Sequence, residues 1–238
     1  MMEGGVPPHG TRVYTYAVPD RAGPGPADPS SVAWMYHSHV DEEHDVASGL
    51  MGTIIVTRKG MARADGSPKD VEREFVTMYG INSESDSWYI MDNVKKFARE
   101  PDKADPKRRG WINDNLRFDI NGYAFGNMPM PTMRVGDRVR WYAMGDADND
   151  FENHTPHWHG QSLLSMGMRT DTLSIQPASM QTADMIPDNP GVWLFHCHFP
   201  GHQSSGMVEL FKVLPARSTA AKHAPKKPAP MAMAAMHR

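Results

Sequence analysis

The chain has 238 residues, a net charge of −3, one Cys, 12 His and 19 Met. A single Cys excludes an intramolecular disulfide framework, the slightly acidic balance excludes a basic footprint for nucleic acid, and no apolar run is long enough to predict a membrane span. The N-terminus has neither a basic nor an apolar segment, so we predict no signal peptide in this chain. Imidazole and thioether groups suit copper as ligands, so the placement of His and Met along the chain is the informative feature.

The first part of the chain, residues 1–62, is predicted to be β-structure between turns. Strand-like runs occupy residues 12–18, 32–40 and 52–60, where β-branched and aromatic side chains are frequent. The polar stretch 63–70 is typical of a linker. We therefore expect one β unit to end here and a second to follow.

The second block, residues 71–214, is also predicted to be β-structure. Its strand candidates are short and separated by turn residues; they occupy residues 71–81, 117–122, 132–144, 162–166, 171–175, 191–199 and 208–214. Only residues 88–99 show a helical pattern. Many short strands with frequent turns predict an all-β sandwich or barrel. The tail, residues 215–238, is rich in Met, Lys, Pro and Ala and is predicted to be disordered.

Eight of the 12 histidines fall into three motifs, and each motif contains one HxH pair. The histidines of the three pairs are His37 and His39, His157 and His159, and His196 and His198. Alternate residues of a strand face the same side, so the two imidazoles of each pair point together. Three such pairs converging on one place would hold a multinuclear metal site.

The remaining members of these motifs predict a second kind of site. His154 lies at odd spacing from His157, and Cys197 lies between two histidines, so an extended chain aims both at the opposite face. Together with His202 and Met207 they supply the His₂Cys set with a weak axial Met of a blue-copper site. Cys197 is then the thiolate ligand, and its two chain neighbours, on the other face, offer a covalent route for electrons between the two sites.

These motifs resemble those of the multicopper oxidases, most closely the two-domain small laccases. The matching runs are WMYHSHV (34–40), HTPHWHG (154–160) and LFHCHFPGHQSSGM (194–207), and residues 18–60 are also similar to ceruloplasmin-type ferroxidase domains. The resemblance covers about residues 6–214. It implies an all-β chain of two cupredoxin-like Greek-key β-sandwich domains, the first (1–62) incomplete at its N-terminus and the second spanning 71–214.

The resemblance also implies a role for each motif residue. Type 1 copper would be held by His154, Cys197, His202 and Met207. Type 2 copper would be held by His157, and the type 3 pair by His37, His39, His159, His196 and His198. The catalytic electron route would run through His196, Cys197 and His198. The family uses ten histidines and this chain offers eight, because the first HxH motif is absent. Ser38 stands where a Cys would be, so the first domain would lack its own type 1 copper.

The activity implied is one-electron oxidation of a small reductant coupled to four-electron reduction of O₂ to water. The reductant would be a phenol, an aromatic amine, or Cu(I) or Fe(II). Two-domain relatives imply a homotrimer with the cluster at the subunit interface, and a periplasmic or secreted location. The carboxylates beside the motifs could relay protons or be solvated loop charge; they are Asp41, Glu42, Glu43, Asp146, Asp148, Asp150 and Glu152.

Several alternatives stay open at this point. One is a non-catalytic blue-copper protein that transfers electrons or sequesters copper with a defective cluster; another is copper nitrite reductase, whose mononuclear site does not need the HCH motif. A hydrolytic HxHxDH motif beginning at His37 fails at Glu42. The Met residues around the third motif and in the tail could guide Cu(I) or pack in the core. We expect His44 to be a solvated loop residue.

Overall fold

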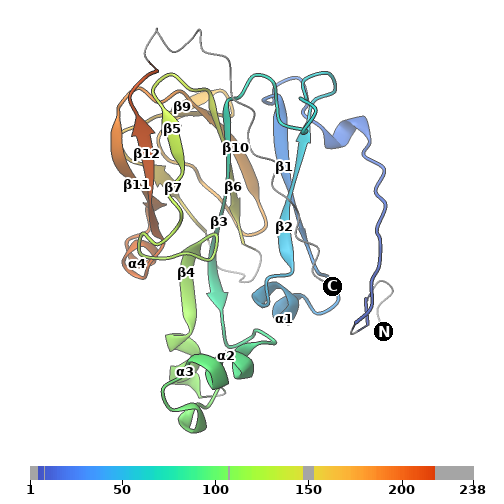
Figure 1. Cartoon of the computed structure of the whole chain (residues 1–238), viewed down its shortest axis with the longest axis vertical. Helices are drawn as coiled ribbons and strands as arrows, with labels where there is room; N and C mark the ends of the chain where they lie inside the picture. The colour runs from blue at the N-terminus through green and yellow to red at the C-terminus, as the bar shows by residue number, and fades with distance from the viewer. Residues whose placement is uncertain (1–4, 8, 107, 147–152, 218–238) are drawn as a thin grey trace.

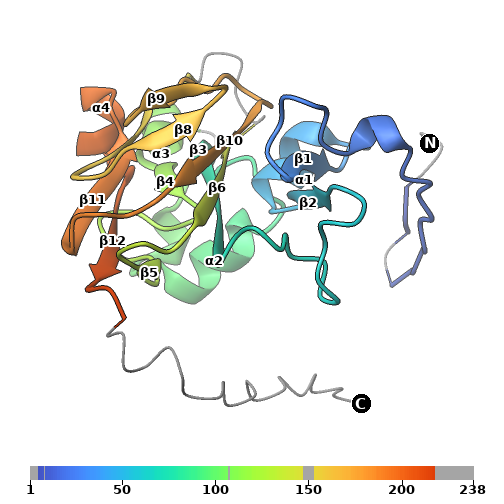
Figure 2. The same cartoon turned by 90° about the horizontal axis from the view of Figure 1, so that it is seen from above.

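A computed structural model describes residues 5–7, 9–106, 108–146 and 153–217. A two-stranded antiparallel ribbon, β1 (Ser31–His37) and β2 (Met51–Thr57), stands beside a β-sandwich (Figures 1 and 2). The strands predicted at 32–40 and 52–60 are thereby confirmed.

The sandwich consists of a six-stranded and a four-stranded sheet. The first has the order β4-β3-β6-β10-β8-β9 and the second β5-β12-β11-β7. In chain order the strands are β3 (Arg73–Ser83), β4 (Leu116–Ile120), β5 (Thr132–Arg134), β6 (Val139–Gly145), β7 (Pro156–Trp158), β8 (Leu163–Ser165), β9 (Met168–Thr170), β10 (Met180–Met185), β11 (Gly191–Cys197) and β12 (Val208–Leu214). The all-β class is confirmed, with a cupredoxin-like sandwich. The division into two domains stays a prediction.

The core between the two sheets is built around aromatic rings. The ring of Trp141 on β6 lies 5.4 Å from that of Trp158 on β7 and 5.6 Å from that of Phe195 on β11, and all three side chains are fully buried. Such pairs contribute about 0.5–1.5 kcal/mol each beyond the area they bury. They fix β7 and β11, which carry two of the histidine motifs, against the six-stranded sheet.

The ribbon packs on the outer face of the six-stranded sheet, with β1 against β6 and β10. Ala33 and Met35 of β1 join Tyr142 and Met144 of β6 in a small apolar cluster. The molecule therefore has three layers, and the six-stranded sheet separates the ribbon from β7 and β11 (Figure 1).

A buried arginine ties the ribbon to the sandwich. Arg140 on β6 is 2% exposed; its guanidinium donates to the hydroxyls of Ser30 and Ser31 at 2.8 and 2.7 Å. The same guanidinium makes a bidentate pair with Asp184 of β10 at 2.7 and 2.9 Å. Bidentate pairing offsets the cost of burying the charge.

The described residues also form four short α-helices outside the sheets: α1 (Glu42–Ala47), α2 (Ile90–Phe97), α3 (Arg109–Asp114) and α4 (Pro200–Ser204). They include 3₁₀ turns at Asp20–Ala22 and Pro101–Lys103. The helix predicted at 88–99 is confirmed as α2, and the others were not predicted. The sequence predicted a loop around His44, which instead lies in α1. None of the described helices is long and apolar enough to cross a membrane.

Two predicted strands are wrong. Residues 12–18 form no strand; the side chains of Val13 and Tyr16 are exposed and no neighbouring strand is described that could pair with them. Residues 171–175 make only isolated bridges, from Thr172 and Ile175. The segment predicted as a linker folds back on itself through a bridge between Ala62 and Pro68. The tail beyond residue 217 lies outside the described residues.

Removing the buried guanidinium should destabilise the fold. Arg140→Ala leaves the carboxylate of Asp184 and two buried hydroxyls without their donor, and we expect it to lower the free energy of unfolding by about 2–4 kcal/mol. The matched control is Arg138→Ala, whose pair with Glu72 is exposed on both sides and whose loss should cost less than about 1 kcal/mol. Urea denaturation measures both, and equal losses would show that the buried network does not anchor the ribbon.

Candidate copper sites

The antiparallel register of β7 and β11 sorts the motif residues onto two faces. His196 pairs with His157, and Phe195 with Trp158. Cross-strand partners lie on the same face of a sheet. Phe195, Trp158 and Cys197 belong to the buried core, so the two paired histidines lie on the opposite face.

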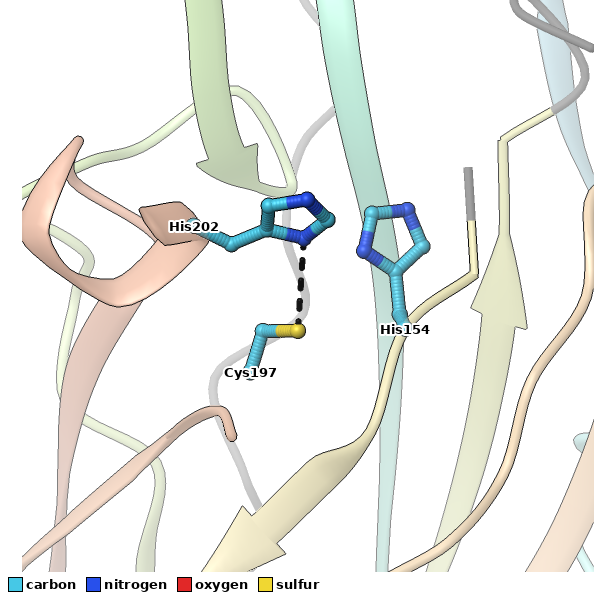
Figure 3. A group of neighbouring side chains, drawn as sticks. All are labelled: His154, Cys197 and His202. Carbon is cyan, nitrogen blue, oxygen red and sulfur yellow. Dashed lines mark hydrogen bonds between the residues drawn. The ribbon is translucent and has the colours of Figure 1, made fainter. Parts of the chain in front are cut away.

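The first candidate site gathers the donor atoms of His154, Cys197 and His202, all within 4.8 Å of one another. In Figure 3 the three side chains point toward one another; His154 comes from the segment before β7, Cys197 from the end of β11 and His202 from α4. Cys197 Sγ lies 3.5 Å from His202 Nδ1. His154 and Cys197 are fully buried.

The surroundings of the Cys197 thiol favour its ionised form. Burial by itself raises its pKa, but hydrogen bonds from the imidazoles of His154 and His202, and from the backbone N–H groups of Thr155 and Phe199, lower the pKa to about 5. The N–H of Thr155 lies 3.4 Å from Sγ. The thiolate, which is the metal-binding form, therefore predominates at neutral pH.

This donor set fits a copper ion. Ligand atoms at about 2.0–2.3 Å from one ion lie no more than roughly 4.6 Å apart, which matches the spacing of the three donors. Two imidazoles with one thiolate are the set of blue-copper sites. Met207 is fully buried in the same core cluster as Cys197, and its carbonyl accepts the N–H of Cys197 at 3.1 Å. Its role as axial ligand stays a prediction.

The second candidate site is a cluster of four imidazoles. The donor atoms of His157, His159 and His196 lie within 4.8 Å of one another, and Nε2 of His159 is 2.9 Å from Nε2 of His196. The ring of His198 lies 5.1 Å from that of His157 and 5.6 Å from that of His196. This group is called the four-histidine cluster below.

Hydrogen bonds and burial prepare the four-histidine cluster for metal. Burial lowers the pKa of His157, His159 and His196, and neighbouring imidazoles lower it further, which favours the neutral, metal-binding form. Nδ1 of His157 lies 3.1 Å from the carbonyl of Asp171, and Nδ1 of His196 lies 2.8 Å from the carbonyl of Cys197. A carbonyl only accepts, so Nδ1 carries the proton and Nε2 is left for a metal.

The third histidine pair is not part of this cluster within the chain. His37 and His39 lie at the end of β1, with ring centroids 5.9 Å apart. No ring contact between described residues joins them to the four-histidine cluster, and the ribbon and β11 lie on opposite sides of the molecule in both views (Figures 1 and 2). The structure thus brings together four of the six histidines expected to converge.

The structure adds groups that the sequence did not single out. Asp171 and Thr172 hold Nδ1 of His157 from the segment after β9, and only the tertiary fold brings them there. Among the carboxylates considered for proton relay, Glu42 contacts both His37 and His39. Asp148, Asp150 and Glu152 lie outside the described residues.

Comparison with known proteins agrees with these donor sets. A family model described as multicopper oxidase matches residues 98–217. The chain is 38% identical over 209 residues to ferroxidase HEPHL1 of Homo sapiens, covering 87% of this chain and 18% of that protein. It is 38% identical over 201 residues to ceruloplasmin of Mus musculus, covering 84% of this chain and 19% of that protein. The chain thus spans about a fifth of the length of the curated relatives it matches.

Among solved structures, copper nitrite reductase from Nitrosomonas europaea matches with a TM-score of 0.56 at 19% identity, covering 81% of this chain and 63% of that one. At this identity the likeness shows the cupredoxin-like fold alone. The family match over half of the sequence carries the assignment, and the resemblance seen in the motifs is confirmed: the chain belongs to the multicopper oxidase family.

Proposed function

We propose that this chain forms an oxidase that takes single electrons from a small reductant at the site of His154, Cys197 and His202 and reduces O₂ to water at the four-histidine cluster. Copper, when bound, supplies the one-electron chemistry at both sites. The observation that carries the proposal is that both donor sets meet at the end of β11: its last residue, Cys197, belongs to the first set, and the chain neighbours His196 and His198 belong to the second.

The two sites are covalently connected through adjacent residues of the chain. One peptide unit joins Cys197 to His196 and another joins it to His198. The hydrogen bond between Nδ1 of His196 and the carbonyl of Cys197, at 2.8 Å, adds a second connection between them. We therefore propose that His196, Cys197 and His198 form the route by which electrons pass between the two sites.

The cluster is completed, in this proposal, by a second copy of the chain. His37 and His39 would bind the type 3 pair together with the neighbouring subunit's four-histidine cluster, in which His157 serves type 2 copper. The side chain of His39 is 86% exposed and free to meet another subunit. The homotrimer expected from the resemblance would bring the two surfaces together.

Aromatic compounds are the reductants we favour. His202 is the partly exposed ligand of the first site, and its ring lies 5.5 Å from that of Phe118 and 5.3 Å from that of Phe199. An apolar aromatic rim favours a flat organic reductant through ring packing. Iron is the second candidate, because a relative at 38% identity is named a ferroxidase.

Oxygen uptake tests the proposed oxidase. The copper-loaded protein should consume one O₂ for every four electrons taken from an aromatic diamine. His159→Ala should reduce this uptake at least about 100-fold because a cluster ligand is lost, while the visible absorption of the copper–thiolate site persists. A wild-type protein with that absorption but no O₂ uptake would instead be an electron-transfer or copper-sequestering protein, and one that reduces nitrite would support the nitrite reductase alternative.

The aromatic rim can be tested separately. Phe199→Ala should raise the KM for an aromatic diamine several-fold and leave the rate with Fe(II) nearly unchanged, since the ring contributes about 0.5–1.5 kcal/mol of packing to a flat ligand only. Phe97→Ala, which removes an exposed ring of α2, is the matched control and should change neither rate. Equal effects of Phe199→Ala on both reductants would argue against the rim as a binding surface.

A further inference from the structure

The acidic run after the second motif, DEEHD (41–45), is a short helix rather than a solvated loop. Within α1, Glu42 and Asp45 are three residues apart, so their side chains lie on the same face of the helix. Both carboxylates contact the His37-Ser38-His39 motif. The sequence pattern shows only a run of charged residues here. The helix places two of their carboxylates in contact with the motif.

Glu42 touches both imidazoles of the motif. Its Oε1 lies 3.4 Å from Nδ1 of His37, and its Oε2 lies 3.4 Å from Nδ1 of His39. Nδ1 of His37 also lies 2.9 Å from the carbonyl oxygen of Ser38. Carbonyl oxygens only accept hydrogen bonds, so Nδ1 of His37 is the donor to Ser38. The carboxylate beside Nδ1 of His39 favours a proton on that atom. In the neutral rings, Nε2 is then the atom with a free lone pair.

Asp45 holds the residue between the two histidines. Its Oδ2 accepts the hydroxyl of Ser38 at 2.5 Å, and its Oδ1 accepts the indole N–H of Trp88 at 3.0 Å. The ring of His44 stacks on that of Trp88, with centroids 4.7 Å apart. The helix is therefore anchored both to the motif and to the segment that leads into α2.

We propose that α1 is a positioning element for the His37-Ser38-His39 motif: Glu42 favours the Nδ1–H tautomer of His39 and supports that of His37, which also donates to the Ser38 carbonyl. Asp45 anchors the helix to the motif, and both Nε2 atoms are left as copper ligands. Glu42 and Asp45 are positioning residues in the sense that they act through the histidines. A carboxylate behind a ligand histidine commonly fixes its tautomer and orientation. The identity of the bound ion rests on the proposed function, whereas the tautomers are a property of the chain itself.

The tautomers can be read directly in the metal-free protein. Long-range ¹H–¹⁵N correlation at about pH 8, where ordinary imidazoles are neutral, should show His37 and His39 as Nδ1–H tautomers. In Glu42→Ala, His39 loses the carboxylate beside its Nδ1 and should shift to Nε2–H, while His37 keeps the carbonyl of Ser38 and should stay Nδ1–H. Glu43→Ala, with the same charge change at an exposed neighbouring position, should leave both rings unchanged.

The outcomes separate this proposal from the proposed function. An Nε2–H tautomer of His39 in the wild type, or an unchanged His39 in Glu42→Ala, would overturn the role of Glu42. Asp45→Ala should give a mixture of His39 tautomers, and a pure Nδ1–H signal would remove Asp45 from the positioning role. A tautomer shift in Glu42→Ala with no copper at His37 and His39 in the loaded wild type would leave the positioning role standing and refute the completed cluster.

Discussion

The antiparallel pairing of β7 with β11 is the contact on which both candidate copper sites depend. It places His157 opposite His196 and Pro156 opposite Cys197. A slip of one residue would turn every side chain of a strand to the other face, which would put the thiolate among the imidazoles and histidines into the core. The ring contacts of Trp158 and Phe195 with Trp141 resist that slip, because either ring would have to leave the space between the sheets.

The two faces of this strand give the sites different surroundings. Cys197 and His154 lie in a close-packed interior, where neighbouring groups move little and solvent screens interactions with the sulfur only weakly. The four-histidine cluster lies on the other face, where His198 is exposed and where a second chain could approach. These surroundings suit the proposed oxidase, in which the buried thiolate site accepts electrons and the more open four-histidine cluster reduces O₂.

Much of the candidate chemistry could be predicted from spacing alone. Alternate residues of any strand share a face, so HCH separates a thiol from two imidazoles whatever the rest of the fold is. What could not be predicted depends on segments distant in sequence: the carbonyl of Asp171 behind His157, and the position of His37 and His39 beyond the six-stranded sheet. Local pattern also failed at 12–18, where β-branched and aromatic residues suggested a strand but no partner is described.

The proposed oxidase requires that Cys197 belong to one copper site while its chain neighbours belong to another. The most direct measurement compares visible absorption, EPR and bound copper in the loaded wild type and in Cys197→Ser. In Cys197→Ser the intense copper–thiolate absorption should vanish and bound copper should fall by about one ion per chain, while copper at the histidines remains. Absorption that survives the substitution, or loss of copper from both sites in a variant with an unchanged circular dichroism spectrum, would contradict this requirement.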